Sequence, residues 1–545
     1  MKSTPVLKKA GMLAAVAALA SSVAIAGCSK NEGNGNVGGS AKPSGSDGQS
    51  AVPAISVSMY DRGNVPPEAG TIVDNLWTRW VNEESGVKVT YSPVPRWESV
   101  VKYNALLAAG DAPDLILEYD AGFRNQLYLQ KQIIPLDDMI EKSGEYKALM
   151  EKFPLLRTLG TKSDGKIYEF GRVLGYIPGT FLFIREDWLE KLNLKAPETT
   201  AEAFEVMKAF ANGDPDDNGK PDTYGTNLSG AGWISTAFQD TGWVIEDGVM
   251  VKDWERAKAA TAYKKRLFDE GLVDKDYLTD KNGEKSLQDF VSGKVGLFAY
   301  SGNVVQIYNN YETLKKNVPD AKLAVIAFPR SEFGQFSPEF NPPIQMSGVV
   351  NVKAKSPEGV MRYVDFMSSE STIHTFKYGL PDVHYKMEDG TEVIIDQDKY
   401  DKEVSWLGDF RMLGGQYLIN EYDKYLTDLD QSKPLDKEVY DMMTKARELY
   451  ISKERPVPSI THGQYMPGLP NDLQFIANNT NTPISDLLGK SIVSGGSYTA
   501  EQALTEAQDL WTKSGGAKLE EWYAQWYQEN KDTWVFADDL YSMVF

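Results

Sequence analysis

One short loop places oxygen-bearing side chains at the alternating positions that a calcium ion requires. Aspartate or asparagine stands at loop positions 1, 3, 5 and 9, a glycine stands at position 6, and position 7 offers a backbone carbonyl. This spacing matches an EF-hand-type calcium loop, in which alternate residues of a tight turn direct hard oxygens inward. Because a glycine replaces the usual glutamate at position 12, water would complete the coordination. The candidate ligands of one structural calcium ion are Asp214, Asp216, Asn218, Lys220 and Asp222.

The alternative for this loop is a metal-free Asx turn that links a helix to a strand. A bound ion would hold together three carboxylates that otherwise repel one another. The loop follows a predicted helix directly, away from the candidate ligand residues described next, so we expect a structural role for the ion.

Aromatic, acidic and basic residues follow the ends of three predicted strands near the N-terminus. In a parallel sheet, ligands bind beyond the carboxyl ends of the strands. The mixture suits sugar hydroxyls, because rings can stack on a sugar and charged groups can form paired hydrogen bonds with it. The alternative is that these are polar loop residues that serve solubility. The candidate ligand-binding residues are Asp61, Arg62, Arg96, Tyr119 and Asp120.

Four further aromatic residues stand beside glycine or polar residues, in loops or at strand ends. Aromatic residues in such places have less reason to be in a core, and they can stack on a sugar ring. They are Trp233, Trp243, Tyr300 and Trp406. No spacing isolates two carboxylates as an acid–base couple, and no phosphate-binding Gly-Lys-Ser/Thr sequence is present. The sequence therefore predicts a binding site without catalytic residues.

Cys28 is the only cysteine, and its position indicates membrane attachment. It follows a lysine-bearing segment and a short apolar run, which together have the pattern of a signal peptide over residues 1–27. The sequence Ile25-Ala-Gly-Cys28 resembles the bacterial lipobox, whose cysteine receives a diacylglyceryl group and, after cleavage, becomes a further acylated N-terminus. Residues 28–53 are rich in Gly, Ser and Asn and predict a flexible tether. The alternative is an ordinary signal peptide with a chance cysteine.

Length and charge limit the possible classes of protein. The chain has 545 residues, more than the roughly 250–300 that one hydrophobic core usually serves, so at least two lobes are expected. Its net charge of −20 disfavours binding to nucleic acid, because an acidic surface repels phosphates. One cysteine and three separated histidines cannot form a Cys/His zinc cluster.

Hydrophobic periodicity predicts the elements that position these residues. Near the N-terminus, alternation predicts strands over 55–60, 87–91 and 114–119, and helical spacing predicts helices over 71–82 and 98–109. This alternating order implies a parallel sheet with right-handed crossovers. A second unit follows, with predicted strands over 166–170, 180–184, 293–300 and 323–328, and another strand–helix stretch begins with a predicted strand over 347–352. Further helices are predicted over 187–192, after a capping box at Thr199, and over 358–367, 435–452 and 500–528.

Several segments, taken in order, resemble a known family. They are Asp111–Asp114, Ile184–Leu192, Asp214–Gly225, Ser292–Leu297 and Gly379–Tyr385. Together with the lipobox and tether, they resemble the LipO-like branch of the family 1 extracellular solute-binding lipoproteins, the substrate-capture subunits of carbohydrate ABC importers in Gram-positive bacteria. The chain departs from the family at Leu380-Pro381, where an acidic residue and glycine are common. Similar alginate-oligosaccharide-binding proteins carry a related calcium loop.

The resemblance implies an α/β fold of two lobes, the type II periplasmic-binding-protein-like fold, with crossing segments that join the lobes. We expect the N-terminal lobe to comprise residues 54–175 and 346–405, and the C-terminal lobe residues 176–345 and 406–545. The implied protein is a non-catalytic monomer, lipid-anchored on the outer face of the cell membrane, that passes an oligosaccharide to permease subunits. The alternatives are a surface-anchored polysaccharide hydrolase or lyase, and an adhesin that does not close.

Overall fold

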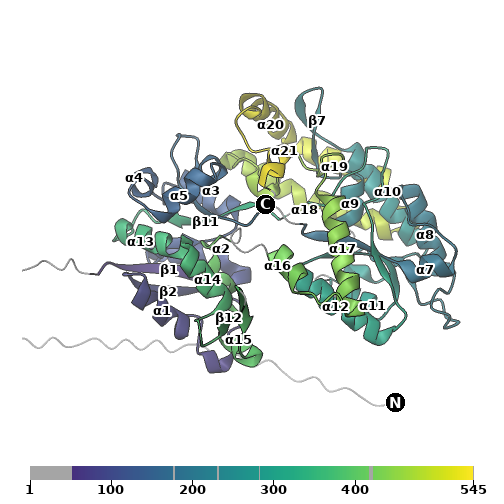
Figure 1. The fold of residues 1–545 in the computed structure, drawn as a ribbon. Helices are drawn as coiled ribbons and strands as arrows, with labels where there is room; N and C mark the ends of the chain where they lie inside the picture. Colours follow the sequence, from purple (N-terminus) through teal and green to yellow (C-terminus); the bar gives the residue numbers. More distant parts are fainter. Residues whose placement is uncertain are drawn as a thin grey trace, which may run out of the picture. The chain divides into compact units, whose positions relative to one another are not determined.

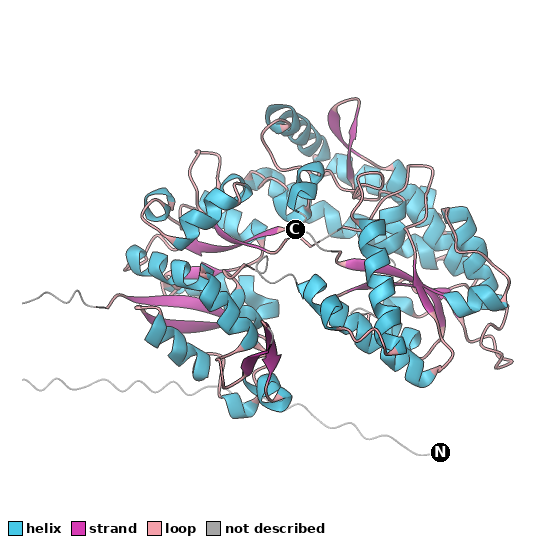
Figure 2. Cartoon of the chain, in the orientation of Figure 1, coloured by secondary structure: helices cyan, strands magenta, loops and turns pink. Residues whose placement is uncertain are grey.

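The computed structural model describes residues 52–175, 178–229, 232–280, 283–339, 341–388, 390–415 and 421–543. The signal peptide, Cys28 and nearly all of the tether lie outside the described residues. Figure 2 shows the strands of the two main sheets enclosed among helices. The predicted α/β class is confirmed.

The first sheet has five strands in the order β2-β1-β3-β11-β4. β1 pairs in parallel with β2 and β3, as the strand–helix–strand pattern predicts. β11 comes from a much later part of the sequence and runs antiparallel to both of its neighbours. The strands are β1 (Ala54–Asp61), β2 (Lys88–Pro95), β3 (Leu115–Leu117), β4 (Phe170–Val173) and β11 (Ile344–Val350).

The second sheet has four strands in the order β10-β5-β9-β6, of which β6 and β9 are parallel. Two hairpins, β7–β8 and β12–β13, form separate small sheets. These strands are β5 (Thr180–Arg185), β6 (Tyr224–Thr226), β7 (Trp243–Glu246), β8 (Val249–Lys252), β9 (Val295–Ser301), β10 (Leu323–Val325), β12 (Tyr385–Glu388) and β13 (Thr391–Ile394).

Helices occupy most of the remaining described chain (Figure 1). In the half built on the first sheet they are α1 (Leu76–Glu84), α2 (Ser99–Ala109), α3 (Ala121–Leu129), α4 (Asp137–Ile140), α5 (Glu145–Lys152), α6 (Leu155–Gly160), α13 (Pro357–Ser368), α14 (Glu370–Tyr378) and α15 (Gln397–Glu403). The others are α7 (Glu186–Lys191), α8 (Thr200–Asn212), α9 (Gly232–Ala237), α10 (Glu255–Asp269), α11 (Glu284–Val291), α12 (Val304–Asn317), α16 (Glu421–Asp428), α17 (Pro434–Tyr450), α18 (Asn471–Val493), α19 (Ala500–Lys513), α20 (Gly516–Asn530) and α21 (Ala537–Leu540). None of these helices is both long enough and apolar enough to cross a membrane.

Local sequence signals account for several helix and strand boundaries. The predicted capping box of α8 is present: the Thr199 hydroxyl accepts from the backbone of Glu202, whose carboxylate accepts from the backbone of Thr199. The helix predicted over 500–528 is instead two helices, because Gly515 takes the left-handed conformation at φ 87° between them. The strand predicted over 166–170 is shifted, and β4 begins only at Phe170.

The two main sheets have separate hydrophobic cores. The chain leaves the first sheet after β4, forms the second sheet, and returns to the first for β11. It contributes again to the second core through α16 and α17, and its last described residues, from Val535 to Met543, pack into the first core. A smaller aromatic core joins α18, α19 and α20 to β8. Several passages of the chain therefore connect the two α/β halves.

Candidate functional site

The parallel register of β1 and β2 brings predicted ligand residues to one edge of the first sheet. Asp61, the last residue of β1, pairs with Pro95, the last residue of β2, so the two strands end level. Arg62 and Arg96 therefore follow at the same edge. Tyr119 lies just beyond β3, the other neighbour of β1.

Aromatic rings surround the Arg96 guanidinium at this edge. Its Cζ lies 4.7 Å from the centre of the Tyr60 ring, 5.4 Å from that of Trp97 and 5.8 Å from that of Tyr119. Such distances permit cation–π attraction. Tyr60 and Tyr119 are also 5.7 Å apart, ring centre to ring centre. We call Tyr60, Arg62, Arg96, Trp97, Tyr119 and Arg172 the arginine–aromatic cluster.

Two arginines of the cluster are fixed by partners from distant parts of the chain. Arg62 binds both carboxylate oxygens of Asp409, at 2.6 Å from Nε and 3.0 Å from Nη2. Arg172, on β4, donates to the side chain of Gln345 on β11 and to the backbone carbonyl of Arg411. Such planar, paired contacts fix the direction of a guanidinium. The cluster is therefore preorganised by the fold.

Trp97 is the most exposed large ring of the cluster, with 82% of its surface accessible. Exposing so much apolar ring costs free energy in water, and a ring in this position can stack on a ligand. The guanidinium carbons of Arg62 and Arg96 lie 5.9 Å and 5.4 Å from its ring centre. The cluster can therefore offer a ring face and guanidinium donors side by side.

Two predicted acidic ligands have carboxylate oxygens already engaged by the backbone. Asp61 accepts from the backbone nitrogen of Gly63, 2.9 Å away. Asp120 caps α3 by accepting from the backbone nitrogen of Phe123 at 2.6 Å. Both side chains lie at the correct sheet edge, but these contacts are sufficient to explain their presence.

The structure buries Trp233 and Trp406 instead of exposing them to a ligand, so packing accounts for both rings and a ligand-binding role stays a prediction. Trp233 lies in α9 with no exposed surface, and its ring packs against Tyr263 in the second core. Trp406 is 7% exposed and donates to the backbone carbonyl of Lys402. Neighbouring glycine and polar residues suggested exposure, but tertiary packing buries both rings.

Trp243 and Tyr300 lie outside the arginine–aromatic cluster. Trp243, on β7, packs against Tyr523 of α20, with ring centres 4.5 Å apart. Tyr300, on β9, lies beside Phe298 at 6.2 Å. Both are partly exposed, so a ligand-binding role for them stays a prediction.

Several residues that build the site are not among the candidate ligand residues. Trp97 follows Arg96 beyond the same predicted strand end, and this position was the signal for it. Asp409 and Gln345 are 347 and 173 residues from the arginines they bind, and no local pattern indicates such partners.

The candidate calcium loop gathers its carboxylates around one side-chain amide. The Asn218 amide nitrogen donates to Asp216 at 2.7 Å and to Asp222 at 2.9 Å. Asp214 accepts from the backbone nitrogens of Asn218 and Gly219. Gly219, at position 6, adopts φ 72°, the turn that this loop type requires.

The negatively charged carboxylates of this loop repel one another. Partial burial, together with the neighbouring carboxylates of Asp214 and Asp222, raises the pKa of Asp216. The part of the chain that the structure describes contains no group of three or more His, Cys, Asp or Glu placed to hold a metal ion. The residue types and the turn of the loop match a cation site, but the carboxylates are not gathered around one point, and the Asn218 amide donates to two of them.

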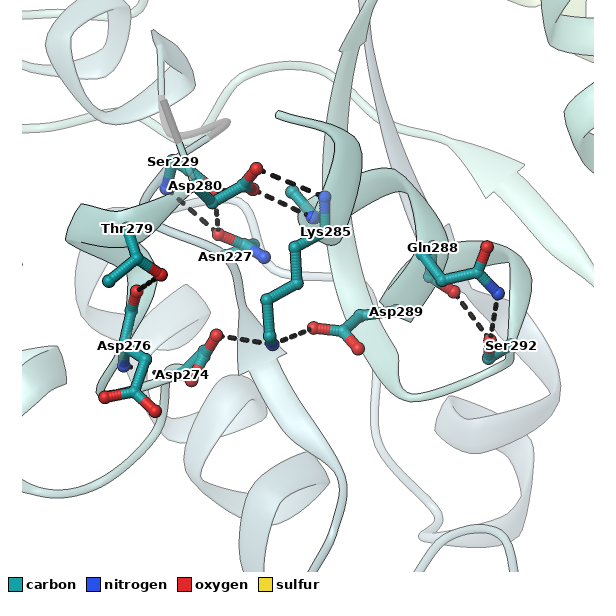
Figure 3. Close-up of polar contacts among 11 residues, drawn as sticks. Asn227, Ser229, Asp274, Asp276, Thr279, Asp280, Lys285, Gln288, Asp289 and Ser292 are labelled. Atoms are coloured by element: carbon teal, nitrogen blue, oxygen red, sulfur yellow. Dashed lines mark hydrogen bonds and ion pairs between the residues drawn. The ribbon is translucent and has the colours of Figure 1, made fainter. Parts of the chain in front are cut away.

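In the second half, polar side chains near the end of β6 form a network closed on itself (Figure 3). Ser229 donates to Asp280 at 2.8 Å, and Asp280 also accepts from backbone nitrogens at the start of α11. Lys285 lies 2.6 Å from Asp274 and 2.8 Å from Asp289. The hydrogen bonds that Lys285 donates to these two carboxylates raise its pKa. The polar side chains of this network are paired with one another, so we assign it no ligand.

A pocket of about 300 Å³ is lined by residues from both halves of the fold. Tyr378 and Tyr400 come from α14 and α15, whereas Tyr422 and Tyr425 come from α16. None of the predicted ligand residues lines it. Aromatic and hydroxyl groups in a concave surface suit a small polar ligand. The pocket is therefore separate from the arginine–aromatic cluster, and a ligand there could contact both halves.

Comparison with known proteins identifies the family. The sequence model of one protein family, the bacterial extracellular solute-binding proteins, matches residues 80–379 of this chain. The chain belongs to this family. This solute-binding protein is similar to lipoprotein LipO of Bacillus subtilis (strain 168). The two are 25% identical over 481 residues, which cover 82% of this chain and 87% of LipO.

A second curated relative of this solute-binding protein is the polygalacturonan/rhamnogalacturonan-binding protein YtcQ of Bacillus subtilis (strain 168). The two are 28% identical over 387 residues, 65% of this chain and 72% of that one. The crystal structure of the alginate-binding protein AlgQ2 without calcium ion has a similar fold, with a TM-score of 0.64 and 19% identity over 88% of this chain and 99% of that one. The predicted two-lobed solute-binding fold is thereby confirmed.

Proposed function

We propose that this solute-binding protein captures an oligosaccharide outside the cell and delivers it to the permease subunits of an ABC transporter. The observation that carries the proposal is the arginine–aromatic cluster, where the 82% exposed ring of Trp97 adjoins two guanidinium groups at the strand ends. A sugar needs both a stacking face and hydrogen-bond donors. The relative YtcQ is a polygalacturonan/rhamnogalacturonan-binding protein, and AlgQ2, which has a similar fold, is an alginate-binding protein; both support a carbohydrate ligand.

The test is calorimetric titration of the mature protein with a panel of plant and algal oligosaccharides. We expect saturable binding to at least one sugar, a raised melting temperature in its presence, and recovery of the sugar unchanged. Chain-shortened products would instead establish a polysaccharide hydrolase or lyase. Absence of binding to every sugar of the panel would contradict capture of these oligosaccharides.

We assign residues 54–175 and 346–405 to the N-terminal lobe and 176–345 and 406–545 to the C-terminal lobe. The two cores favour this division over most of the chain. The packing of Trp406 and Leu413 into the first core favours moving the later boundary beyond them, and Val535 and Met543 also pack into the first core. A sugar that contacts both lobes would favour a closed state. The protein would act as a monomer. Unchanged small-angle scattering at saturation with a sugar would favour an adhesin that does not close.

Cys28 is the proposed lipid attachment site, on the outer face of the membrane. We expect Cys28→Ala to release the protein from cells or leave an uncleaved precursor, because the acceptor thiol is lost. The measurement is partitioning into a detergent phase, with Ser29→Ala as the control that keeps the thiol. A cleaved Cys28→Ala protein that still enters the detergent phase would contradict the assignment.

One structural calcium ion is the proposed cofactor, held by the side chains of Asp214, Asp216, Asn218 and Asp222 and the carbonyl of Lys220. When bound, the ion would neutralise the repulsion among the carboxylates and tie the loop between α8 and β6. At a free calcium concentration of 100 times Kd, the stabilisation would be about 2.7 kcal/mol.

We therefore expect a chelator to lower the melting temperature without changing the chemistry of sugar recognition. Asp216→Asn should weaken the response to added calcium, since it removes one ligand charge. Asp217→Asn removes a neighbouring charge outside the ligand set and is the matched control. If neither calcium nor chelator changes the melting temperature, and titration with calcium gives no heat of binding, the loop is a metal-free turn.

A further inference from the structure

Three arginines meet at one sheet edge of a protein whose net charge is −20. Burial and the charge of Asp409 raise the pKa of the Tyr119 hydroxyl, and the charges of Arg172, Arg62 and Arg96 oppose that rise. The guanidinium carbons of Arg62 and Arg96 lie 6.0 Å and 4.7 Å from the centre of the Tyr60 ring. Those of Arg172 and Arg96 lie 5.5 Å and 5.8 Å from the centre of the Tyr119 ring. A neutral ligand does not require such a concentration of positive charge.

Arg96 differs from the other two arginines because the described residues offer it no hydrogen-bond or ion-pair partner. Its Nε is buried without a partner. The surrounding rings of Tyr60, Trp97 and Tyr119 provide cation–π contacts but accept none of its planar hydrogen bonds. An unsatisfied buried donor costs free energy, which a ligand acceptor would recover.

The acidic groups near the cluster do not neutralise Arg96. Asp409 is held by Arg62 through both carboxylate oxygens. Glu118 is 1% exposed and accepts from the backbone of Asp120 through one oxygen, while its other oxygen is buried without a partner. It forms no ion pair with Arg96 among the residues that the structure describes. The Asp61 carboxylate is engaged by the nitrogen of Gly63. The positive charge of Arg96 therefore remains available to a ligand.

We propose that the protein prefers an acidic oligosaccharide and that Arg96 receives a sugar carboxylate, as found in uronic acids. This inference rests on the proposed capture of an oligosaccharide and specifies its chemical class. A guanidinium binds a carboxylate through two parallel hydrogen bonds, a geometry that a hydroxyl cannot match. The ring of Trp97, with its large exposed face, stacks on the same or the adjoining sugar unit.

The test compares sugars that differ only in charge. The probes are trigalacturonate and alginate trisaccharides, the methyl ester of trigalacturonate, and neutral fructo- and galacto-oligosaccharides, each titrated calorimetrically at low and high salt. We expect an acidic trisaccharide to bind at least about 10-fold more tightly than its ester or the neutral sugars, with the advantage reduced by salt.

Arg96→Gln is expected to weaken binding of the acidic sugar about 10- to 100-fold while changing binding of the ester little. Arg96→Lys, which keeps the charge but loses the planar pair of donors, should be intermediate. Arg79→Gln is the matched control, because Arg79 is an exposed arginine of α1 whose ion-pair partner is Asp74. Because Arg96→Lys keeps a cation beside the rings and Arg96 has no hydrogen-bond or ion-pair partner among the described residues, the melting temperature of Arg96→Lys should remain unchanged, which separates weaker binding from loss of stability.

If a neutral sugar binds tightly and Arg96→Gln does not change its affinity, this inference is overturned, whereas the proposed capture of an oligosaccharide still stands. Stronger binding of a sulfated galactan oligosaccharide than of any uronate would overturn the carboxylate assignment. Absence of binding by every sugar would contradict both the inference and the proposed function.

Discussion

Trp233→Ala is expected to lower the free energy of unfolding by about 3–5 kcal/mol, the usual cost of removing a large buried ring. Trp233 has no exposed surface, and its neighbours in the second core include Tyr263 and Ile234. Its indole nitrogen lies 3.4 Å from the hydroxyl of Thr226 at the end of β6. The substitution therefore leaves a cavity and an unsatisfied hydroxyl, not an altered binding surface.

Trp97→Ala is the matched comparison, because the chemical change is the same and the starting ring is 82% exposed. We expect almost no change in unfolding but weaker oligosaccharide binding, through loss of the stacking face. Urea denaturation measures the first effect and calorimetric titration the second. A stable Trp233→Ala protein that fails to bind sugar would show that Trp233 contacts the ligand after all.

Glu169→Ala is expected to destabilise the first half of the fold by about 3–5 kcal/mol, because it leaves buried positive charge without a partner. The side chains of Arg124 and Glu169 are 2% and 3% exposed and lie 2.8 Å apart. Lys162 contacts the other carboxylate oxygen. Glu141→Ala removes an acid from an exposed pair with Lys147 and should leave unfolding unchanged.

The same group predicts a dependence of stability on pH. Burial opposes ionisation of Glu169, but the charges of Arg124 and Lys162 outweigh it and lower the pKa. The stabilisation is therefore present above the unfolded pKa of about 4.3 and is lost as pH falls towards the folded value. Urea denaturation between neutral pH and pH 3 measures this loss, and Glu169→Gln should reduce it. Equal pH dependence in the two proteins would contradict the assignment.

The features that could be predicted from sequence are those set by neighbouring residues. The capping box of Thr199 and Glu202 needs only a three-residue spacing, and the strand Ala54–Asp61 is apparent from alternation. The sheet edge with Arg62 and Arg96 was predictable because parallel strands end together.

The remaining features depend on contacts between distant segments. Trp233 stands in a sequence that suggests a loop, and only the packing of α9 against the second core shows that it is buried. Asp409 and Gln345 reach the cluster from later passages of the chain, so the partners of Arg62 and Arg172 have no sequence signature. Conversely, the calcium loop has a sequence signature without a preformed group of three acidic ligands.

The insertion of β11 between β3 and β4 has a consequence for biogenesis. An extracellular protein emerges from its membrane translocation channel N-terminus first, so β1 to β4 emerge long before residues 344–350 can join their sheet. The residues from Val535 to Met543, which complete the same core, emerge later still. Until then, apolar faces remain uncovered, and the nascent chain is a target for proteases and for aggregation at the cell surface. We therefore expect the first core to be completed only after the whole chain has been exported.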